Sequence, residues 1–514
     1  MSEPSLQLPN LATRKGVLRI AALVATAAWL GAAADASAAV PAIALTPAQN
    51  HPQGTTQVNG ANFGANEAVD IYFDTTDEAL GVTNASGAFP KTPIGVPASA
   101  APGTHYVTAV GRHSGLAAQK AFTVNTDWAQ FHFSPKLKGF NAWENVLGAG
   151  NVASLDVAWT GGIQSSFTYS SPTVANGIVY IGSSNDDLYA FNATTGALLS
   201  GWPVTTGNSI ESSPAVANGV IYVGSDDDKV YAFNATTGAL LSGWPVTTGN
   251  QIAGCSPTVV NGVVYIGSTD DKLYAFNATS GTAISGWPVT TGGAIDSTPA
   301  VANGIVYVGS YDTKLYAFNA TTGALLSGWP VKTNGAIGSS PAVANGVVYV
   351  GSYDDNVYAF DDISGAPLAG WPVTTGSYIG SSPAVANGMV YVGSADNKLY
   401  AFNARTGALY WSAATGQAII SSPAVANGVV YVGSGDGNLY AFDLFGDPLW
   451  SATTEDFEGS SPAVANDMIY VGSNDGNLYA YALNGGNNAV YRKTPEPPAT
   501  SSLRPDWGLK PATH

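Results

Sequence analysis

The residues of this chain with the clearest chemical potential are two carboxylates that stand directly before a repeated Ser/Thr-Pro pair. Glu211 precedes Ser-Ser-Pro and Asp296 precedes Ser-Thr-Pro, so the two acids occupy the same point of two repeated units. Carboxylate oxygens at that point could collect a cation, since Ca²⁺ takes several oxygen ligands. The simpler interpretation, which we favour, is that both are solvated acids of surface loops.

The loops that lead into each repeated unit differ most among the units. By contrast, residues 191–208 and 233–250 are identical over 18 positions. A catalytic site needs different residues that converge on one point, whereas near-copies supply repeated surfaces suited to scaffolding or weak multivalent binding. The candidate binding residues predicted from the divergent loops are Glu211, Asp296, Tyr378, Glu455, Asp456, Phe457 and Glu458.

Other catalytic constellations are difficult to assemble. All five histidines lie outside residues 160–483, and Cys255 is the only cysteine. The repeat region therefore has no Ser-His or Cys-His pair and no histidine metal site. Cys255 stands where other units carry serine, which favours a small core substitution over a nucleophile. We predict no catalytic residue and no metal ligand, and we attribute the recurrent aspartates, such as Asp270, to turn chemistry.

Eight copies of one pattern fill the C-terminal two-thirds of the chain and must position these loops. Each copy contains Ser/Thr-Pro, an Ala-Val-Ala run, a Val-Val-Tyr-Val run and a Leu-Tyr-Ala-Phe run, and successive copies begin 39 to 43 residues apart. Asn-Gly and Asp-Gly turns between apolar runs are strong hairpin signals. Units of about 40 residues built from short strands predict an all-β fold, a β-propeller.

The positions of the tryptophans predict the number of blades. Seven units end near a tryptophan and the eighth does not, whereas Trp159 precedes the first unit. We therefore predict eight blades, with a strand near residues 154–160 that completes blade eight and leaves no open edge. We expect the outermost strand to end at the tryptophan. The predicted docking tryptophans are Trp159, Trp202, Trp244, Trp287, Trp329, Trp371, Trp411 and Trp450.

One motif carries a family resemblance. Ala-Phe-Asn-Ala-Arg-Thr-Gly at residues 401–407, followed by Trp411, resembles the tryptophan-docking motif of pyrroloquinoline-quinone (PQQ)-type propeller repeats, with Asn in place of the usual Asp. The resemblance covers about residues 127–482 and implies the propeller fold. The family contains quinone-dependent dehydrogenases, a propeller lipoprotein of the outer-membrane assembly machine, and secreted propellers of unassigned role.

The resemblance also implies what a quinone enzyme of this family would need. Such enzymes hold the quinone with calcium, a catalytic Asp, a nearby Arg and commonly a vicinal disulfide. One cysteine cannot form that disulfide, and Arg405, the only arginine between residues 160 and 483, falls in a turn away from the axis. We expect no cofactor; the alternative is a PQQ- and calcium-dependent oxidoreductase with an atypical site.

The ends of the chain predict export. Residues 1–38 read as a signal peptide, with basic residues, an apolar run and a small-residue cleavage site. Residues 40–125 alternate apolar and polar between Gly/Pro turns, which predicts a small β-sandwich resembling immunoglobulin-like modules of the IPT/TIG type. We assign residues 127–483 to the propeller and expect residues 484–514 to form a flexible tail.

Composition narrows the partners. The formal net charge is −17, which disfavours nucleic acid and anionic lipid. We expect no membrane span after signal cleavage, since no other segment has the required length. The sequence thus predicts an exported, monomeric, non-enzymatic binding or scaffold protein, periplasmic or at the cell surface, with a protein or polysaccharide partner.

Overall fold

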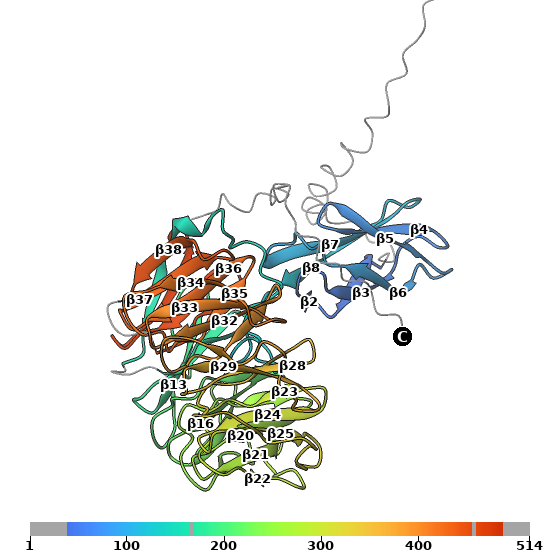
Figure 1. Cartoon of the computed structure of the whole chain (residues 1–514). Helices are drawn as coiled ribbons and strands as arrows, with labels where there is room; N and C mark the ends of the chain where they lie inside the picture. Colours follow the sequence, from blue (N-terminus) through green and yellow to red (C-terminus); the bar gives the residue numbers. More distant parts are fainter. Residues whose placement is uncertain (1–38, 165–168, 455–458, 487–514) are drawn as a thin grey trace, which may run out of the picture.

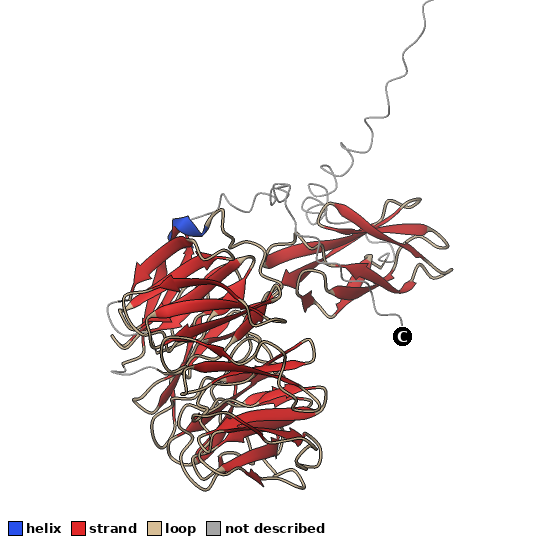
Figure 2. Ribbon diagram, viewed as in Figure 1, coloured by secondary structure: helices blue, strands red, loops and turns tan. Residues whose placement is uncertain are grey.

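The computed structural model describes residues 39–164, 169–454 and 459–486. Within these ranges the chain is all-β, with 3-10 turns only at η2 (Val152–Ser154) and η3 (Asn484–Gly486). Figure 2 shows strands throughout both lobes. In the described ranges no helix has the length and apolarity needed to cross a bilayer. The predicted signal peptide lies outside the described residues, as does all but the first three residues of the predicted tail.

The N-terminal lobe is a two-layer β-sandwich (Figure 1). Alternating side chains such as Val58 from one sheet and Ile71 from the other fill a single apolar core between them, as period-2 strands require. One sheet contains β1 (Ala42–Thr46), β3 (Thr55–Ala61) and β6 (Phe89–Gly95); the other contains β2 (Gln49–Asn50), β8 (Ala117–Val124), β7 (Gly103–Gly111), β4 (Ala68–Phe73) and β5 (Thr76–Val82).

The repeats form eight antiparallel sheets, numbered here 1 to 8 in chain order of the innermost strand. Sheets 1 to 4 contain, from the innermost strand outward, β11 (Thr173–Ala175), β12 (Ile178–Gly182), β13 (Asp187–Asn192), β14 (Val204–Thr205); β15 (Ala215–Ala217), β16 (Val220–Ser225), β17 (Lys229–Asn234), β18 (Val246–Thr247); β19 (Thr258–Val260), β20 (Val263–Gly267), β21 (Lys272–Asn277), β22 (Val289–Thr290); and β23 (Ala300–Ala302), β24 (Ile305–Ser310), β25 (Lys314–Asn319), β26 (Val331–Lys332).

Sheets 5 to 8 continue the same order. They contain β27 (Ala342–Ala344), β28 (Val347–Gly351), β29 (Asn356–Asp361), β30 (Val373–Thr374); β31 (Ala384–Ala386), β32 (Met389–Ser394), β33 (Lys398–Asn403), β34 (Leu409–Ala414); β35 (Ala424–Ala426), β36 (Val429–Ser434), β37 (Asn438–Asp443), β38 (Pro448–Thr453), with β9 (Phe140–Asn141) added to β35; and β39 (Ala463–Ala465), β40 (Met468–Gly472), β41 (Asn477–Leu483), β10 (Leu155–Gly162).

The last sheet is completed by a strand from ahead of the first repeat. β10 pairs antiparallel with β41 across seven residue pairs, and Trp159 opposes Ala480. The indole of Trp159 packs on Gly196 of sheet 1 and donates a 3.0 Å hydrogen bond from Nε1 to the Ala193 carbonyl. Trp411 repeats this contact on the following sheet, where it packs on Gly446 and donates to Leu444 O. Trp329 and Trp450 also donate from Nε1 to carbonyls of the next sheet, whereas Nε1 of Trp202, Trp244, Trp287 and Trp371 has no partner among the described residues.

One expectation about the outermost strands is wrong. In sheets 1 to 5 the fourth strand does not end at the tryptophan; it begins two residues after it, as at Val204–Thr205 after Trp202, and is only two residues long. Proline follows each of these tryptophans and has no N–H to donate to a ladder. In sheets 6 and 7, where no proline follows, the tryptophan lies inside a six-residue strand.

A closed circle of hydrogen bonds joins the starts of the innermost strands. In each sheet the backbone N–H of the Ser/Thr before proline donates to the hydroxyl oxygen of its equivalent in the next sheet, and the circle closes where Ser461 donates to Ser171. Every distance lies between 2.8 and 3.0 Å. The repeated hydroxyl is therefore a device that binds each sheet to its neighbour.

The segment that links the two lobes passes along the innermost strands of all eight sheets. We name residues 126–141 the hub segment, because within 16 residues it contacts the innermost strand of every sheet. Its groups bond the middle valine of each strand, for example Trp128 with Val174 and Gly139 with Val425. The remaining contacts run from Ala129 O, Gln130 Oε1, Pro135 O, Lys136 O, Lys138 O and Asn141 Nδ2 to Val216, Val259, Val301, Val343, Val385 and Val464.

The sandwich contacts the ring beside the hub segment. The hub lies toward the end where the innermost strands finish, since Asn176, in the turn after β11, bonds both Asp127 of the hub and Gln49 of the sandwich. Nearby, the imidazole of His51 stacks on Trp143 with ring centroids 3.9 Å apart. The face at the other end of the strands carries the loops that differ most among the repeated units.

Candidate binding site at the mouth of the ring

The opening at the start of the innermost strands is built from two kinds of loop. In sheets 2 to 7 the turn between the second and third strands is tied to the loop that enters the sheet: Asp226 N bonds Ser209 O, and Tyr311 N bonds Ala294 O, both at 3.0 Å. Equivalent bonds join Thr269 to Gln251, Tyr353 to Ala336, Ala395 to Tyr378 and Gly435 to Ala418. These repeated bonds fix a ring of positions, which we name the mouth.

Among the described residues, charged and aromatic side chains are concentrated on one side of the mouth. At the position directly after Val/Ile-Gly-Ser, sheets 2, 4 and 5 carry Asp226, Tyr311 and Tyr353, whereas sheets 6 and 7 carry Ala395 and Gly435. At the position directly before Ser-Ser-Pro or Ser-Thr-Pro, sheets 2 and 4 carry the two predicted acids, Glu211 and Asp296. Similar scaffolds thus present different side chains at these two positions.

Three carboxylates gather there, and we name Glu211, Asp226 and Asp296 the acid group. Burial raises the pKa of Glu211, and the nearby charge of Asp296 raises it further. Burial, then the charges of Glu211 and Asp296, raise the pKa of Asp226 to about 7. Burial also raises the pKa of Asp296, while the hydroxyl of Tyr311 opposes that rise. Burial is the cause that all three shifts share, and repulsion from neighbouring carboxylates adds to it at Glu211 and Asp226.

A line of aromatic rings continues from the acid group. Tyr311 and Tyr353 lie with ring centroids 6.1 Å apart, and Tyr353 meets Tyr378 edge-on at 5.7 Å. We name these three the tyrosine row. Gly338 makes room for it, because a Cβ there would lie 2.6 Å from the Tyr353 hydroxyl oxygen. The rings remain 39–44% exposed although each contacts another ring.

The predicted binding residues divide into two sets. The structure brings Glu211 and Asp296 into one acid group and places Tyr378 at the end of the tyrosine row. Glu455, Asp456, Phe457 and Glu458 lie outside the described residues. Sequence reasoning attributed Asp226 to turn chemistry and missed Tyr311 and Tyr353. The signal was available, since each of the three replaces a small or polar residue directly after a Gly-Ser that the other units share.

The aspartates that recur in every turn have partners of their own. Asp270 Oδ2 accepts hydrogen bonds from Tyr274 at 2.6 Å and from Lys272 at 2.9 Å, and Oδ1 accepts from the Lys272 backbone. Burial opposes ionisation, but these bonds lower the pKa of Asp270 overall. The same tyrosine-to-aspartate bond recurs in sheets 2 and 4 to 8. These side chains stabilise hairpins.

Two further residues singled out from the sequence also lie away from the mouth chemistry. Cys255 is fully buried, and its sulfur accepts a hydrogen bond from the Gly267 N–H. In sheet 2 the hydroxyl oxygen of Ser212 accepts the equivalent bond from the Gly224 N–H. Burial raises the pKa of the Cys255 thiol far above its usual value. Arg405 lies in the turn between β33 and β34, where Asn403 caps its backbone N–H.

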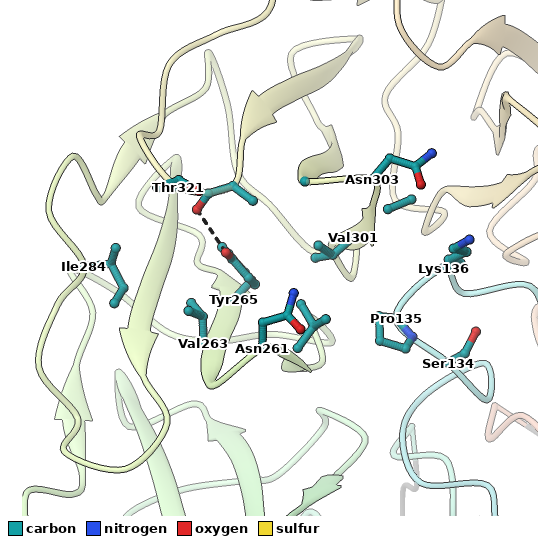
Figure 3. A pocket seen from close by; sticks show the side chains of 14 residues that line it. Ser134, Pro135, Lys136, Asn261, Val263, Tyr265, Ile284, Val301, Asn303 and Thr321 are labelled. Carbon is teal, nitrogen blue, oxygen red and sulfur yellow. Dashed lines mark hydrogen bonds between the residues drawn. The ribbon is translucent and has the colours of Figure 1, made fainter. Parts of the chain in front are cut away.

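A groove of about 540 Å³ opens on the hub side between sheets 3 and 4 (Figure 3). Apolar side chains such as Val263 and Ile284 line it, with Asn261 and Asn303 at its rim and Lys136 of the hub segment on one flank. The buried Tyr265 donates to Ala320 O at 3.0 Å inside it. Its polar groups are few and do not converge, so it lacks the marks of a reaction site.

Family comparisons support the fold on both halves of the repeat region. A family model described as outer membrane protein assembly factor BamB matches residues 111–367, half of the chain. The chain belongs to the PQQ-like, BamB-type family of β-propeller repeat proteins. A second model, described as the β-propeller of a β-alanine-activating enzyme, matches residues 255–500 of this family member. No curated protein is significantly similar to it in sequence.

Solved structures share the propeller fold with this PQQ-like protein at low identity. A europium-containing methanol dehydrogenase is 14% identical with a TM-score of 0.59, over 70% of this chain and 98% of the enzyme. BamB from Moraxella catarrhalis is 18% identical with a TM-score of 0.54, over 64% and 99%. Quinohemoprotein alcohol dehydrogenase ADHIIG from Pseudomonas putida is 17% identical with a TM-score of 0.61, over 76% and 83%. At these identities the likeness concerns the fold alone.

The dehydrogenase neighbours raise the question of whether this mouth fits PQQ, which carries three carboxylates. The acid group and the tyrosine row present negative charge and phenols, and Arg405 is remote from them. Lys272 and Lys314 are held on turn aspartates. An anionic quinone would meet carboxylates without a compensating cation. Among the described residues no three His, Cys, Asp or Glu side chains form a group suited to a metal. The donor set present does not fit the quinone and its calcium.

Proposed function

We propose that this PQQ-like propeller is an exported, non-enzymatic binding or scaffold protein of the cell envelope. On this proposal the eight sheets are the blades of an eight-bladed propeller, and the N-terminal sandwich is an immunoglobulin-like module. The protein acts as a monomer whose ring offers a rigid rim of variable loops to a partner. Assembly factor BamB, with which it shares a family model, gives the proposal its class of activity.

The observation that carries the proposal is that some side chains of the repeats hold the ring together and others vary at the mouth. Hydroxyl circle, hub contacts and tyrosine-to-aspartate bonds recur from sheet to sheet, so most polar side chains of the ring are committed to holding it together. Variable chemistry remains at the mouth, where three half-buried acids lie beside three exposed tyrosines on a fixed frame. A rigid frame with a variable exposed patch suits recognition, because little ordering is needed on binding.

Capture of envelope proteins by the full chain tests the proposal. Immobilised protein is expected to retain a specific partner from an envelope extract, and polysaccharide binding is measured in parallel on a glycan array. If the protein retains no partner protein and no glycan above the level of a heat-denatured control, the result contradicts the binding proposal.

The alternative is a PQQ- and calcium-dependent oxidoreductase, favoured by the fold of the dehydrogenase neighbours. Dye-linked oxidation of alcohols and sugars after addition of PQQ and calcium separates the two. Because the mouth offers the quinone carboxylates no cationic partner among the described residues, we expect no turnover. Quinone-dependent turnover that saturates with PQQ would replace the scaffold proposal.

A further inference from the structure

The tyrosine row is an exposed aromatic surface at the mouth. Its three rings contact one another across sheets 4 and 5 and the loop into sheet 6, yet each keeps about two-fifths of its surface in solvent. Backbone hydrogen bonds to Tyr311, Tyr353 and Tyr378 hold the loops that carry them. Exposed tyrosines on fixed loops offer large contact area at a low cost in conformational entropy.

The acid group gives this aromatic surface a charge preference. Oδ1 of Asp226 and Oδ1 of Asp296 are enclosed and have no hydrogen-bond partner among the described residues. A buried acceptor without a donor is unfavourable, and more so when it is charged. The repulsion that raises the pKa of Asp226 would be relieved by a positive charge at the same place.

The arrangement suits an organic cation better than a metal ion. In the described part of the chain the carboxylates do not form a three-ligand metal group. A guanidinium or ammonium group can bridge more widely spaced acceptors, since it carries several N–H donors. Guanidinium also stacks on aromatic rings. The net charge of −17 attracts basic partners over longer distances.

We propose that the mouth docks an Arg- and Lys-rich segment of a partner protein, with a basic side chain seated between the tyrosine row and the acid group. This inference rests on the proposed binding function and names the chemistry of its partner. Arginine is preferred over lysine at the seat, because only guanidinium combines planar stacking on tyrosine with forked donation to carboxylates.

Fluorescence anisotropy of the full chain with labelled hexa-arginine tests the proposal. Asp296→Asn and Tyr353→Ala are each expected to weaken binding about tenfold. The matched controls are Asp156→Asn and Tyr410→Ala, both exposed on outer strands of the ring; they change binding less than about twofold. Hexa-lysine is expected to bind more weakly than hexa-arginine, and hexa-glutamate not to bind.

Several results would overturn the inference. If Asp156→Asn weakens binding as much as Asp296→Asn, the peptide responds to overall charge and the mouth is not its site. If free arginine amide binds as tightly as hexa-arginine, the occupant is a small cation. Capture from envelope extract separates this failure from that of the proposed function: a partner retained equally by wild type and Tyr353→Ala leaves the binding function standing and removes this site.

Discussion

His132 lies at the centre of the hub segment and makes the stability of the ring sensitive to acid. Its side chain is 2% exposed, stacks on Phe131 and donates from Nδ1 to the Leu137 carbonyl at 3.3 Å. Nε2 has no partner among the described residues. Burial lowers the pKa of His132 from 6.5 to about 4, and the bond to Leu137 opposes this only in part.

A histidine with a lowered pKa stabilises the fold in its neutral form. This contribution is complete above pH 6.5 and is lost as the pH falls toward about 4, because the unfolded chain takes up the proton first. The full shift corresponds to about 3 kcal/mol, of which about 2 kcal/mol is lost between pH 7 and pH 5.

Urea unfolding at several pH values measures this loss. The comparison is with His132→Asn, because His132 has φ +52° and asparagine tolerates that left-handed conformation better than most residues. Asp127, whose pKa burial raises, and Lys138, whose pKa burial lowers, are present in both proteins and cancel in the difference. We expect wild type to lose about 2 kcal/mol more than the variant from pH 7 to pH 5. Parallel pH profiles for the two proteins would refute the reasoning.

Three other outcomes are expected. Trp159→Ala should lower the free energy of unfolding by about 3–5 kcal/mol in urea titration. Val157→Ala, on the exposed side of the same strand, should lower it by less than about 1 kcal/mol. Equal losses would contradict closure of the ring through Trp159. Cys255→Ser should change stability by less than about 1 kcal/mol, and thiol reagents should label wild-type Cys255 only after unfolding; rapid labelling of the native protein would contradict its burial. Hexa-arginine binding should strengthen as the pH rises through about 7, where Asp226 ionises, and this rise should vanish in Asp226→Asn; an unchanged rise in the variant would assign it to another group.

Much of the ring was predictable because the information is local and repeated. Apolar runs between Asn-Gly turns specify hairpins, and the period of about 40 residues specifies how often they recur. Trp159, which had no upstream unit to complete, indicated the strand that pairs with β41. The serine-like place of Cys255 in the repeat also predicted its buried position.

The mouth was only partly predictable because its members come from different sheets. Glu211 and Asp296 were visible as acids at equivalent positions, but Asp226 joins them only once neighbouring sheets are packed side by side. Tyr378 was identified from its divergent loop, while Tyr353 sits in a hairpin turn that reads as ordinary turn sequence. Their contact depends on the angle between adjacent sheets, which no local pattern encodes.

The sequence by itself determined the three inner strands of each repeat, their turns and the number of repeated units, since hydrophobic period and turn chemistry act between near neighbours. Only the tertiary structure decided that residues 126–141 would bond the innermost strand of every sheet. The sequence assigned nearly all of that segment to the propeller, but the segment lacks a strong period and its course could not be predicted. It acquires a defined course because eight inward-facing valines present unpaired backbone groups around one axis, and a buried peptide group must find a partner.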